Sequence, residues 1–185
     1  NLLEKSGLLI QDVTLPDLDL YTRMQQVIVK SEGAAMHRKA LLNNESAMSF
    51  AVRSVISGGL EIDAVDYIKA LSIRSSVLNH LTEKIMSNID ILMLPVSIPT
   101  APEFKPPETM QSAEIDSDFS TMATMTRFAN YLGLPAISIP TGISVNGLPT
   151  ALQLVGKPFE ESKLLAIAAQ YEALRGPFIN PVLGT

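Results

Sequence analysis

The sequence predicts an α/β fold in which a mixed β-sheet is flanked by helices. Short apolar runs bounded by turn residues indicate strands, and longer stretches with apolar residues every three or four positions indicate helices. Helical segments separate these runs except at the predicted hairpin near the C-terminus, and no internal repeat or low-complexity tract is present. Because 185 residues are enough for one hydrophobic core, we expect a single domain over residues 1–185.

The N-terminal part of the sequence predicts one strand and two helices. Residues 7–15 form an apolar run that ends at a proline, which is typical of a strand. Residues 19–42 carry apolar side chains at helical spacings and predict a helix, which is broken at residues 43–45. A shorter helix is expected over residues 47–54, and the two glycines that follow Ser57 mark a turn rather than the setting of a nucleophile.

The middle of the sequence predicts a long helix and a buried strand. The helix covers residues 64–87, with Asp63 as its candidate N-cap. Residues 89–95 form a short apolar run that ends at a proline and predict an interior strand. Five prolines between positions 95 and 107 then indicate a surface loop with a restricted backbone. A further helix is expected over residues 118–132.

The C-terminal part contains the strongest hairpin signal in the sequence. Asn146 and Gly147 form the dipeptide that two-residue hairpin turns prefer, and they join predicted strands at residues 136–144 and 150–155. The last helix is expected over residues 160–174, where apolar residues recur at helical spacing before a glycine and a proline.

Composition excludes several classes of function. The net charge is −5 and Lys and Arg form no cluster, so nucleic acid is not an expected partner. The absence of cysteine rules out disulfides, thiol catalysis and zinc–cysteine sites within this sequence. No apolar run has the length of a membrane span, so we expect no membrane association.

Common catalytic motifs are also absent. The sequence contains no glycine-rich phosphate loop, no GxSxG elbow and no HExxH pair. His37 and His80 have no second imidazole or carboxylate pair at ligand spacing, so we expect structural or surface roles for both and no metal site.

Five blocks of the sequence, in the same order and at similar spacing, resemble the C-terminal part of the amidase-signature family of serine amide hydrolases. The most specific block is TRFANYLGLPAISIP at residues 126–140, which is similar to the family pattern T-R-P-F-N-x-x-G-x-P-A-x-S-x-P. The others lie at residues 64–70, 90–95, 147–156 and 159–172.

Two departures from the family pattern concern the strand end and the hairpin. Val96 stands where the family has a threonine, and Ala151 replaces a glycine of the hairpin. Val96 therefore removes a hydroxyl group from what would be the edge of the substrate pocket.

The resemblance implies that the chain is the C-terminal fragment of a longer amidase-signature domain. Asn1 is not a methionine, and residues 1–7 read as the end of a helix followed by a glycine stop. The family uses a serine nucleophile, a second serine in a cis peptide and a lysine base, all upstream of the matched region. No such segment occurs here, so we expect no catalytic residue in this chain, no activity of the chain alone and no cofactor.

By the same resemblance, the chain would complete the sheet and form one wall of the substrate pocket. The expected wall residues are Val96 and Ser97 after a strand, together with Thr126, Arg127 and Asn130 on a helix. Thr126 and Asn130 are four residues apart and so share one side of that helix. Structural roles are the alternative: Asn130 could satisfy free carbonyls at the helix end, and Arg127 could lie in solvent instead of pairing with an acidic substrate group.

The favoured function is hydrolysis of carboxamide C–N bonds by a free-standing parent amidase. One alternative is a protein like the amide-hydrolysing subunit of the tRNA-dependent amidotransferases, which usually carries a serine-arginine-tyrosine-aspartate stretch that residues 36–50 lack. That branch also has an acidic residue where this chain has Met122, Ala123 and Thr124. The other alternative is a non-catalytic interaction or scaffold domain.

The expected partners follow from this function. They are a small-molecule amide substrate and the missing N-terminal half of the parent enzyme, with a homodimer as a further option. The expected location is the cytoplasm.

Overall fold

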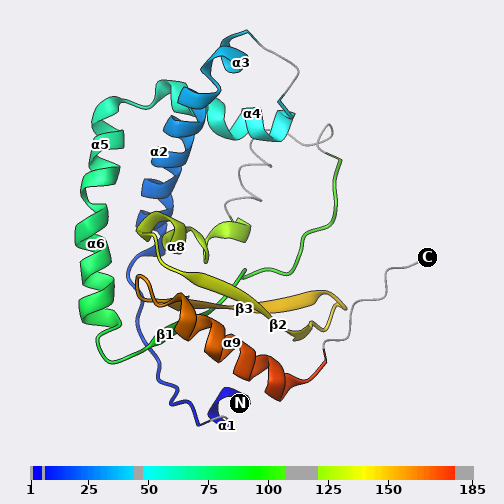
Figure 1. Ribbon diagram of the computed structural model, residues 1–185. Helices are drawn as coiled ribbons and strands as arrows, with labels where there is room; N and C mark the ends of the chain where they lie inside the picture. The colour runs from blue at the N-terminus through cyan, green and yellow to red at the C-terminus, as the bar shows by residue number, and fades with distance from the viewer. Residues whose placement is uncertain (1, 6, 44–47, 107–120, 178–185) are drawn as a thin grey trace.

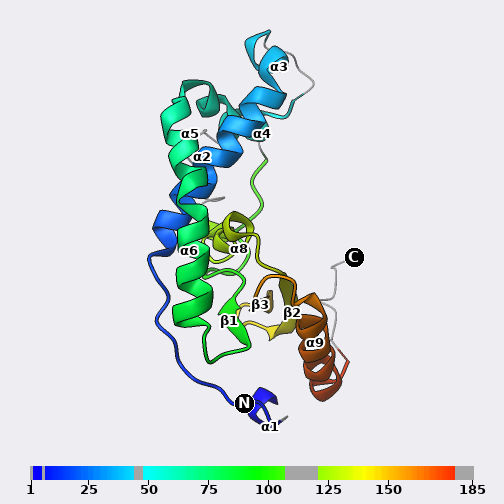
Figure 2. The same cartoon turned by 60° about the vertical axis from the view of Figure 1, so that its left-hand side comes forward.

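The computed structural model describes residues 2–5, 7–43, 48–106 and 121–177. Within these residues a three-stranded sheet lies between two groups of helices (Figures 1 and 2). One side carries α2, α5, α6 and α8, and the other side carries α9. This arrangement confirms the predicted α/β class with helices on both faces of a sheet.

The sheet contains β1 (Ile91–Pro95), β2 (Ala136–Ile143) and β3 (Pro149–Gly156) in the order β1-β3-β2. The predicted strand at 89–95 and the predicted hairpin are therefore confirmed. Both strand pairs are antiparallel, so the parallel pairing implied by a mixed sheet does not occur among the described residues. β1 and β2 therefore run in the same direction on either side of β3.

The prediction of a strand at residues 7–15 is wrong. The segment is extended but joins no ladder, and Leu9 is fully exposed. A groove of about 730 Å³ lies between this segment and β1. Backbone groups form a strand only where a neighbouring strand accepts and donates their hydrogen bonds, and here the groove separates the two segments.

The helices before β1 are more divided than the sequence predicts. The structure has α1 (Leu2–Lys5), α2 (Leu18–Met36), α3 (Arg38–Leu42), α4 (Phe50–Ser57), η1 (Gly58–Glu61), α5 (Ala64–Ser72), α6 (Arg74–His80) and the π-helical turn η2 (Leu81–Ile85). The predicted helix at 19–42 is α2 and α3, which meet at His37, and the predicted helix at 47–54 is shifted to α4. The predicted break at 43–45 lies largely outside the described residues.

The long helix expected over residues 64–87 is a nearly continuous rod made of α5, α6 and η2 (Figure 1). It is divided where Ile73 separates α5 from α6, and it ends in the π-helical turn. Asp63 is the N-cap of α5, but it caps through its backbone: its carbonyl accepts the Asp66 amide at 3.0 Å, and its side chain makes no capping bond.

After β1, the described residues include the helices α8 (Arg127–Leu132) and α9 (Glu161–Arg175). The prediction for α9 is confirmed to within one residue at each end. The expected helix over residues 118–132 is interrupted by a turn at residues 124–126, so α8 begins at Arg127; residues 118–120 lie outside the described part of the chain.

Two apolar clusters hold the layers together. The first lies between the sheet and the helices α2, α6 and α8. Its buried members are Tyr21, Leu81, Met86, Leu92, Phe128, Ala129, Tyr131, Leu132, Leu134 and Val155. The second lies between the opposite sheet face, α9 and α1, and contains Leu3, Ile139, Leu154, Leu164, Ala168 and Tyr171.

Helix α8 is the most buried helix of the first cluster. Phe128, Ala129, Tyr131 and Leu132 are each at most 3% exposed. The Tyr131 hydroxyl donates a 2.6 Å hydrogen bond to the Ala70 carbonyl of α5, and its ring stacks on that of Tyr21 in α2. Burial raises the pKa of the Tyr131 hydroxyl, so it remains a hydrogen-bond donor at neutral pH.

Gly133 ends α8 with a left-handed backbone at φ 71°. The Leu134 amide reaches back to the Ala129 carbonyl at 2.9 Å, the closure typical of a glycine-terminated helix. The positive φ favours glycine, whereas the nearest atom that an added Cβ would meet is the movable end of the Arg74 side chain.

We expect the Tyr131→Phe variant to lower the free energy of unfolding by about 1 to 2 kcal/mol, because it removes a buried hydrogen bond to Ala70. Tyr67→Phe is the matched control, since the Tyr67 hydroxyl bonds Glu32 at an exposed site, and its effect should stay below about 0.5 kcal/mol. Urea unfolding measures both. If the two variants lost the same free energy of unfolding, the buried bond would contribute no more to stability than the exposed one.

A second prediction concerns acid stability. Lys163 Nζ lies 2.9 Å from Asp90 Oδ1, and this hydrogen bond lowers the pKa of Asp90 below its ordinary value of 3.8. A lowered carboxyl pKa stabilises the fold above the ordinary value, and that stabilisation is lost as the pH falls through the lowered pKa. Asp90→Asn should therefore be less stable than wild type at pH 7, and the difference should disappear in acid.

Urea midpoints measured from neutral to acidic pH at low salt test this expectation. Glu172→Gln is the control, because Glu172 lies 3.9 Å from Arg175, too far for a hydrogen bond. A difference between wild type and Asp90→Asn that persists unchanged in acid would show that the ion pair is not its source.

Candidate functional site

The structure places Val96 and Ser97 directly after β1. The Val96 amide donates to the Ala151 carbonyl of β3 at 3.3 Å, so this residue extends the strand pairing by one position. The Ser97 hydroxyl donates to the Pro99 carbonyl at 2.9 Å and stabilises the following turn. Both residues are half-buried, and their polar groups therefore serve the backbone of this loop.

Thr126 lies in the turn that precedes α8. Its amide and its hydroxyl both donate to the Ala123 carbonyl, at 3.0 and 3.1 Å. The hydroxyl therefore closes the local turn, which agrees with the structural alternative for this residue.

Arg127 and Asn130 lie on the part of α8 that is not packed into the core. Asn130 is exposed, whereas Phe128 and Ala129 between them are buried. The Asn130 carbonyl accepts the Gly133 amide at 3.4 Å as part of the helix end. Arg127 is half-buried and lines a groove.

This groove, which we call the α2–α4 groove, has a volume of about 280 Å³. It is lined by Gln25, Gln26, Val29 and Lys30 of α2, Ala51, Val52, Val55 and Ile56 of α4, and Arg127 of α8. Five of these nine side chains are apolar, two are cationic, and no carboxylate is among them. The groove can therefore accept an apolar group with an uncharged or anionic end.

The groove was not predicted from the sequence, because its walls come from helices that lie about 70 to 100 residues before Arg127 along the chain. One feature of the predicted helices could have indicated the groove. Val29 and Val52 lie on predicted helices and are more than 40% exposed in the structure, so their helical faces carry more apolar residues than the core covers.

Gln153 is a second residue that sequence analysis did not single out. It lies in the central strand β3 and is 4% exposed, and its side-chain Nε2 donates to the Met125 carbonyl at 2.8 Å. Leu94 of β1 and Ser138 of β2 are its partners in the two neighbouring strands. Gln153 therefore ties the turn before α8 to the middle of the sheet. The feature of the sequence that could have identified Gln153 is that a polar glutamine lies within an otherwise apolar strand.

Among the described candidate residues, the hydroxyls of Ser97 and Thr126 both donate to backbone carbonyls. Lys163 is hydrogen-bonded to Asp90 and Glu160, which raises its pKa and keeps it protonated. It is therefore unsuited to accept a proton at neutral pH. Within the described residues, no group of three or more His, Asp or Glu side chains could hold a metal ion. None of the described helices combines the length and apolar character needed to cross a membrane.

Comparisons with known proteins identify relatives of this chain. The model of the Amidase family matches residues 1–165. The chain is 32% identical over 181 residues to the fatty acid amide hydrolase of Medicago truncatula, and this match covers 95% of the chain and 29% of that protein. It is 26% identical over 171 residues to an amidase of Pseudomonas putida, a match that covers 92% of the chain and 36% of that protein.

Relatives that belong to a larger assembly also match. Over 112 residues the chain is 31% identical to a component of the glutamyl-tRNA(Gln) amidotransferase of Xanthobacter autotrophicus. This match covers 60% of the chain and 22% of that protein, less than the matches to the fatty acid amide hydrolase and to the amidase of Pseudomonas putida.

A solved structure described as a crystal structure of amidase superposes with a TM-score of 0.78 at 28% identity. The match covers 94% of this chain and 39% of the amidase chain. The chain therefore spans less than half of the length of the relatives it matches. Since the family model covers most of these 185 residues, the chain belongs to the Amidase family, the amidase-signature hydrolases that the sequence blocks resemble.

Proposed function

We propose that this chain is one domain, the C-terminal part of a longer amidase that hydrolyses carboxamide C–N bonds. The match of the Amidase family to residues 1–165 carries this proposal. In the parent enzyme the chain supplies the strands β1, β2 and β3 and one wall of the substrate pocket, made by the loop after β1 and the start of α8. The rest of the parent is its partner, and a homodimer and a cytoplasmic location stay predictions.

The nucleophile and the base belong to the part of the parent outside this chain. Amide hydrolysis by a serine requires a group that accepts its proton and donors that bind the oxyanion. Among the described residues, Lys163 is the lysine whose pKa is shifted, and the shift is upward. We therefore propose that the chain alone is inactive.

We further propose that the substrate is an amide with an apolar acyl group. The α2–α4 groove supports this, because it is mainly apolar and Arg127, a predicted wall residue, forms part of its lining. Each methylene group transferred from water into such a groove contributes about 0.8 kcal/mol to binding. The relative in Medicago truncatula is named a fatty acid amide hydrolase, which agrees with an apolar acyl group.

The amidotransferase alternative is less well supported by the site. Free glutamine carries an ammonium group, which a carboxylate would be expected to bind. The lining of the α2–α4 groove includes no carboxylate among its described residues. A non-catalytic interaction or scaffold domain would have no use for a substrate-sized groove.

The first test compares the chain with its parent. The parent protein should hydrolyse a simple aliphatic amide and should lose this activity to a serine-directed inhibitor, whereas residues 1–185 alone should release no ammonia. Ammonia release measures both. Turnover by the chain alone, undiminished by the inhibitor, would contradict the proposed division of roles.

The second test concerns the acyl group. Val52 is 48% exposed and lines the groove, so Val52→Asp places a charge beside the proposed acyl chain without altering the core. In the parent enzyme this variant should lower kcat/KM for octanamide about 10- to 100-fold, the effect of losing several buried methylene groups, and should leave acetamide nearly unchanged.

Val65→Asp is the matched control, because Val65 is 60% exposed on α5 and lies outside the groove. It should alter neither substrate. If Val52→Asp and Val65→Asp gave the same ratio of kcat/KM for octanamide and acetamide, the groove would not be the acyl site.

A further inference from the structure

We infer that Gln153 is a positioning residue for amide hydrolysis: its side-chain amide holds the Met125 carbonyl and thereby sets the turn that carries Thr126 and Arg127 to the substrate. This inference rests on the proposed function, because Gln153 is expected to act through the pocket wall and not on the reacting atoms.

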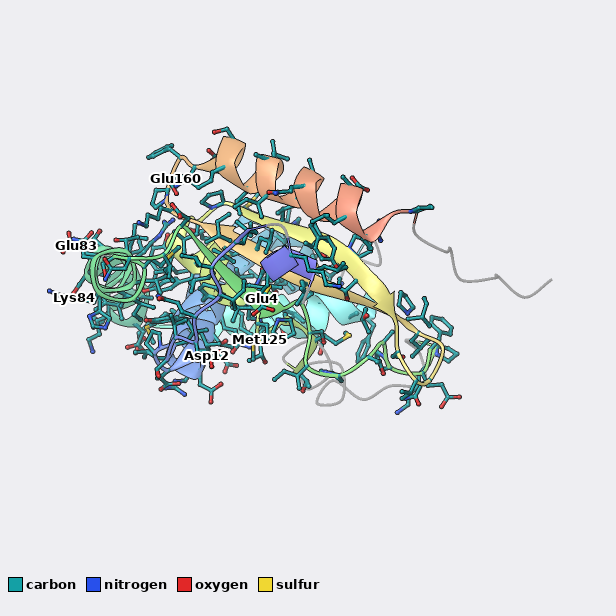
Figure 3. All side chains as sticks on the ribbon, turned by 90° about the horizontal axis from the view of Figure 1, so that it is seen from below. Glu4, Asp12, Glu83, Lys84, Met125 and Glu160 are labelled. Atoms are coloured by element: carbon teal, nitrogen blue, oxygen red, sulfur yellow. The ribbon has the colours of Figure 1, made fainter. Side chains whose placement is uncertain are left out.

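The burial of Gln153 requires a partner for its amide. The side chain is 4% exposed, and the residues next to it in β3 are apolar. A buried amide without a hydrogen bond destabilises a protein, so a glutamine at this position needs a polar group on the α8 side of the sheet. The 2.8 Å bond from Nε2 to the Met125 carbonyl meets this need. Figure 3 shows Met125 on the side of the sheet opposite α9.

The Met125 carbonyl is available because the helix is interrupted at this point. Residues 124–126 form a turn that closes on the Ala123 carbonyl, and α8 begins at Arg127 with Thr126 as its N-cap. In such a helix the N-cap carbonyl accepts the first helical bond, so the carbonyl before it has no partner within α8. Gln153 supplies that partner from a strand 28 positions away in sequence.

The bond connects the turn at residues 124–126 to the central strand of the sheet. Turns have few backbone bonds of their own, whereas β3 is paired on both sides. Arg127, two residues after Met125, lines the α2–α4 groove. A displacement of about 1 Å at a positioning residue can reduce a reaction rate about 100-fold, so the link to β3 is important for the reaction even though Gln153 does not line the groove.

The fold itself depends much less on this bond. Phe128, Tyr131 and Leu132 anchor the rest of α8 in the core, and the Tyr131–Ala70 bond holds it to α5. Loss of the Gln153 donor should therefore release the turn at residues 124–126 and leave α8 in place.

The decisive variant is Gln153→Glu in the parent enzyme. Ionised glutamate cannot donate a hydrogen bond and would repel the Met125 carbonyl, so kcat/KM for octanamide at pH 8 should fall about 10- to 100-fold relative to wild type. Below its pKa the carboxyl group carries a proton that it can donate to the same carbonyl. Burial raises the pKa of a carboxyl group, so the ratio of variant to wild-type kcat/KM should recover as the pH falls from about 8 to 5.

Recovery of the ratio would support positioning, because the described residues that meet Gln153 at this bond and in the sheet carry no titratable group. The strand partners Leu94 and Ser138 are uncharged, as is the Met125 carbonyl. Dividing by the wild-type value removes the pH dependence of the catalytic groups themselves.

Three control variants complete the experiment. Gln153→Leu should lose activity at every pH without recovery, and Gln11→Glu, at an exposed glutamine, should match wild type throughout. Gln153→Asn keeps the amide but is one methylene shorter, and it should also lose activity. It serves in place of Gln153→Leu if circular dichroism shows that the leucine variant is unfolded.

The outcomes separate the two proposals. A wild-type parent without amidase activity would overturn the proposed function and the role of Gln153 with it. An active parent in which Gln153→Glu and Gln153→Leu keep wild-type kcat/KM, or in which both lose it equally at all pH values, would overturn the positioning role alone.

Discussion

The burial of α8 organises the packing of this fold. A helix of six residues is not stable in isolation, because too few backbone bonds form to offset the cost of starting it. Here four of the six side chains are buried between the sheet and the neighbouring helices, and the Tyr131 hydroxyl reaches the Ala70 carbonyl. The same packing that completes the first apolar cluster therefore determines where the remaining α8 side chains lie.

Both ends of α8 are fixed by hydrogen bonds. At its end, Gly133 takes a left-handed conformation and the Leu134 amide donates to the Ala129 carbonyl. At its start, Gln153 binds the carbonyl of Met125. Arg127 then meets the apolar side chains of α2 and α4 at one groove, and this combination of a fixed helix and an apolar groove is what links the fold to the proposed amide chemistry.

Sequence patterns predicted the elements whose signals are local. The Asn146–Gly147 turn specifies its hairpin through backbone preferences, and the periodicity of α9 needs no partner to be recognised. Patterns failed where the outcome depends on a neighbour. Residues 7–15 have the composition of a strand but no adjacent strand, and the helix expected over residues 118–132 is interrupted just before Arg127. A mixed sheet was expected because pairing direction is not encoded in a single strand.

Residue types and their spacing were enough to predict the family, the α/β class and the candidate residues Val96, Ser97, Thr126, Arg127 and Asn130. The contacts of these residues emerged only from the folded chain. The hydroxyls of Ser97 and Thr126 serve local turns, Arg127 lies at the α2–α4 groove, and Gln153 meets Met125. The last two contacts join residues that are far apart in the chain, and packing selects them from many pairs that the sequence permits equally.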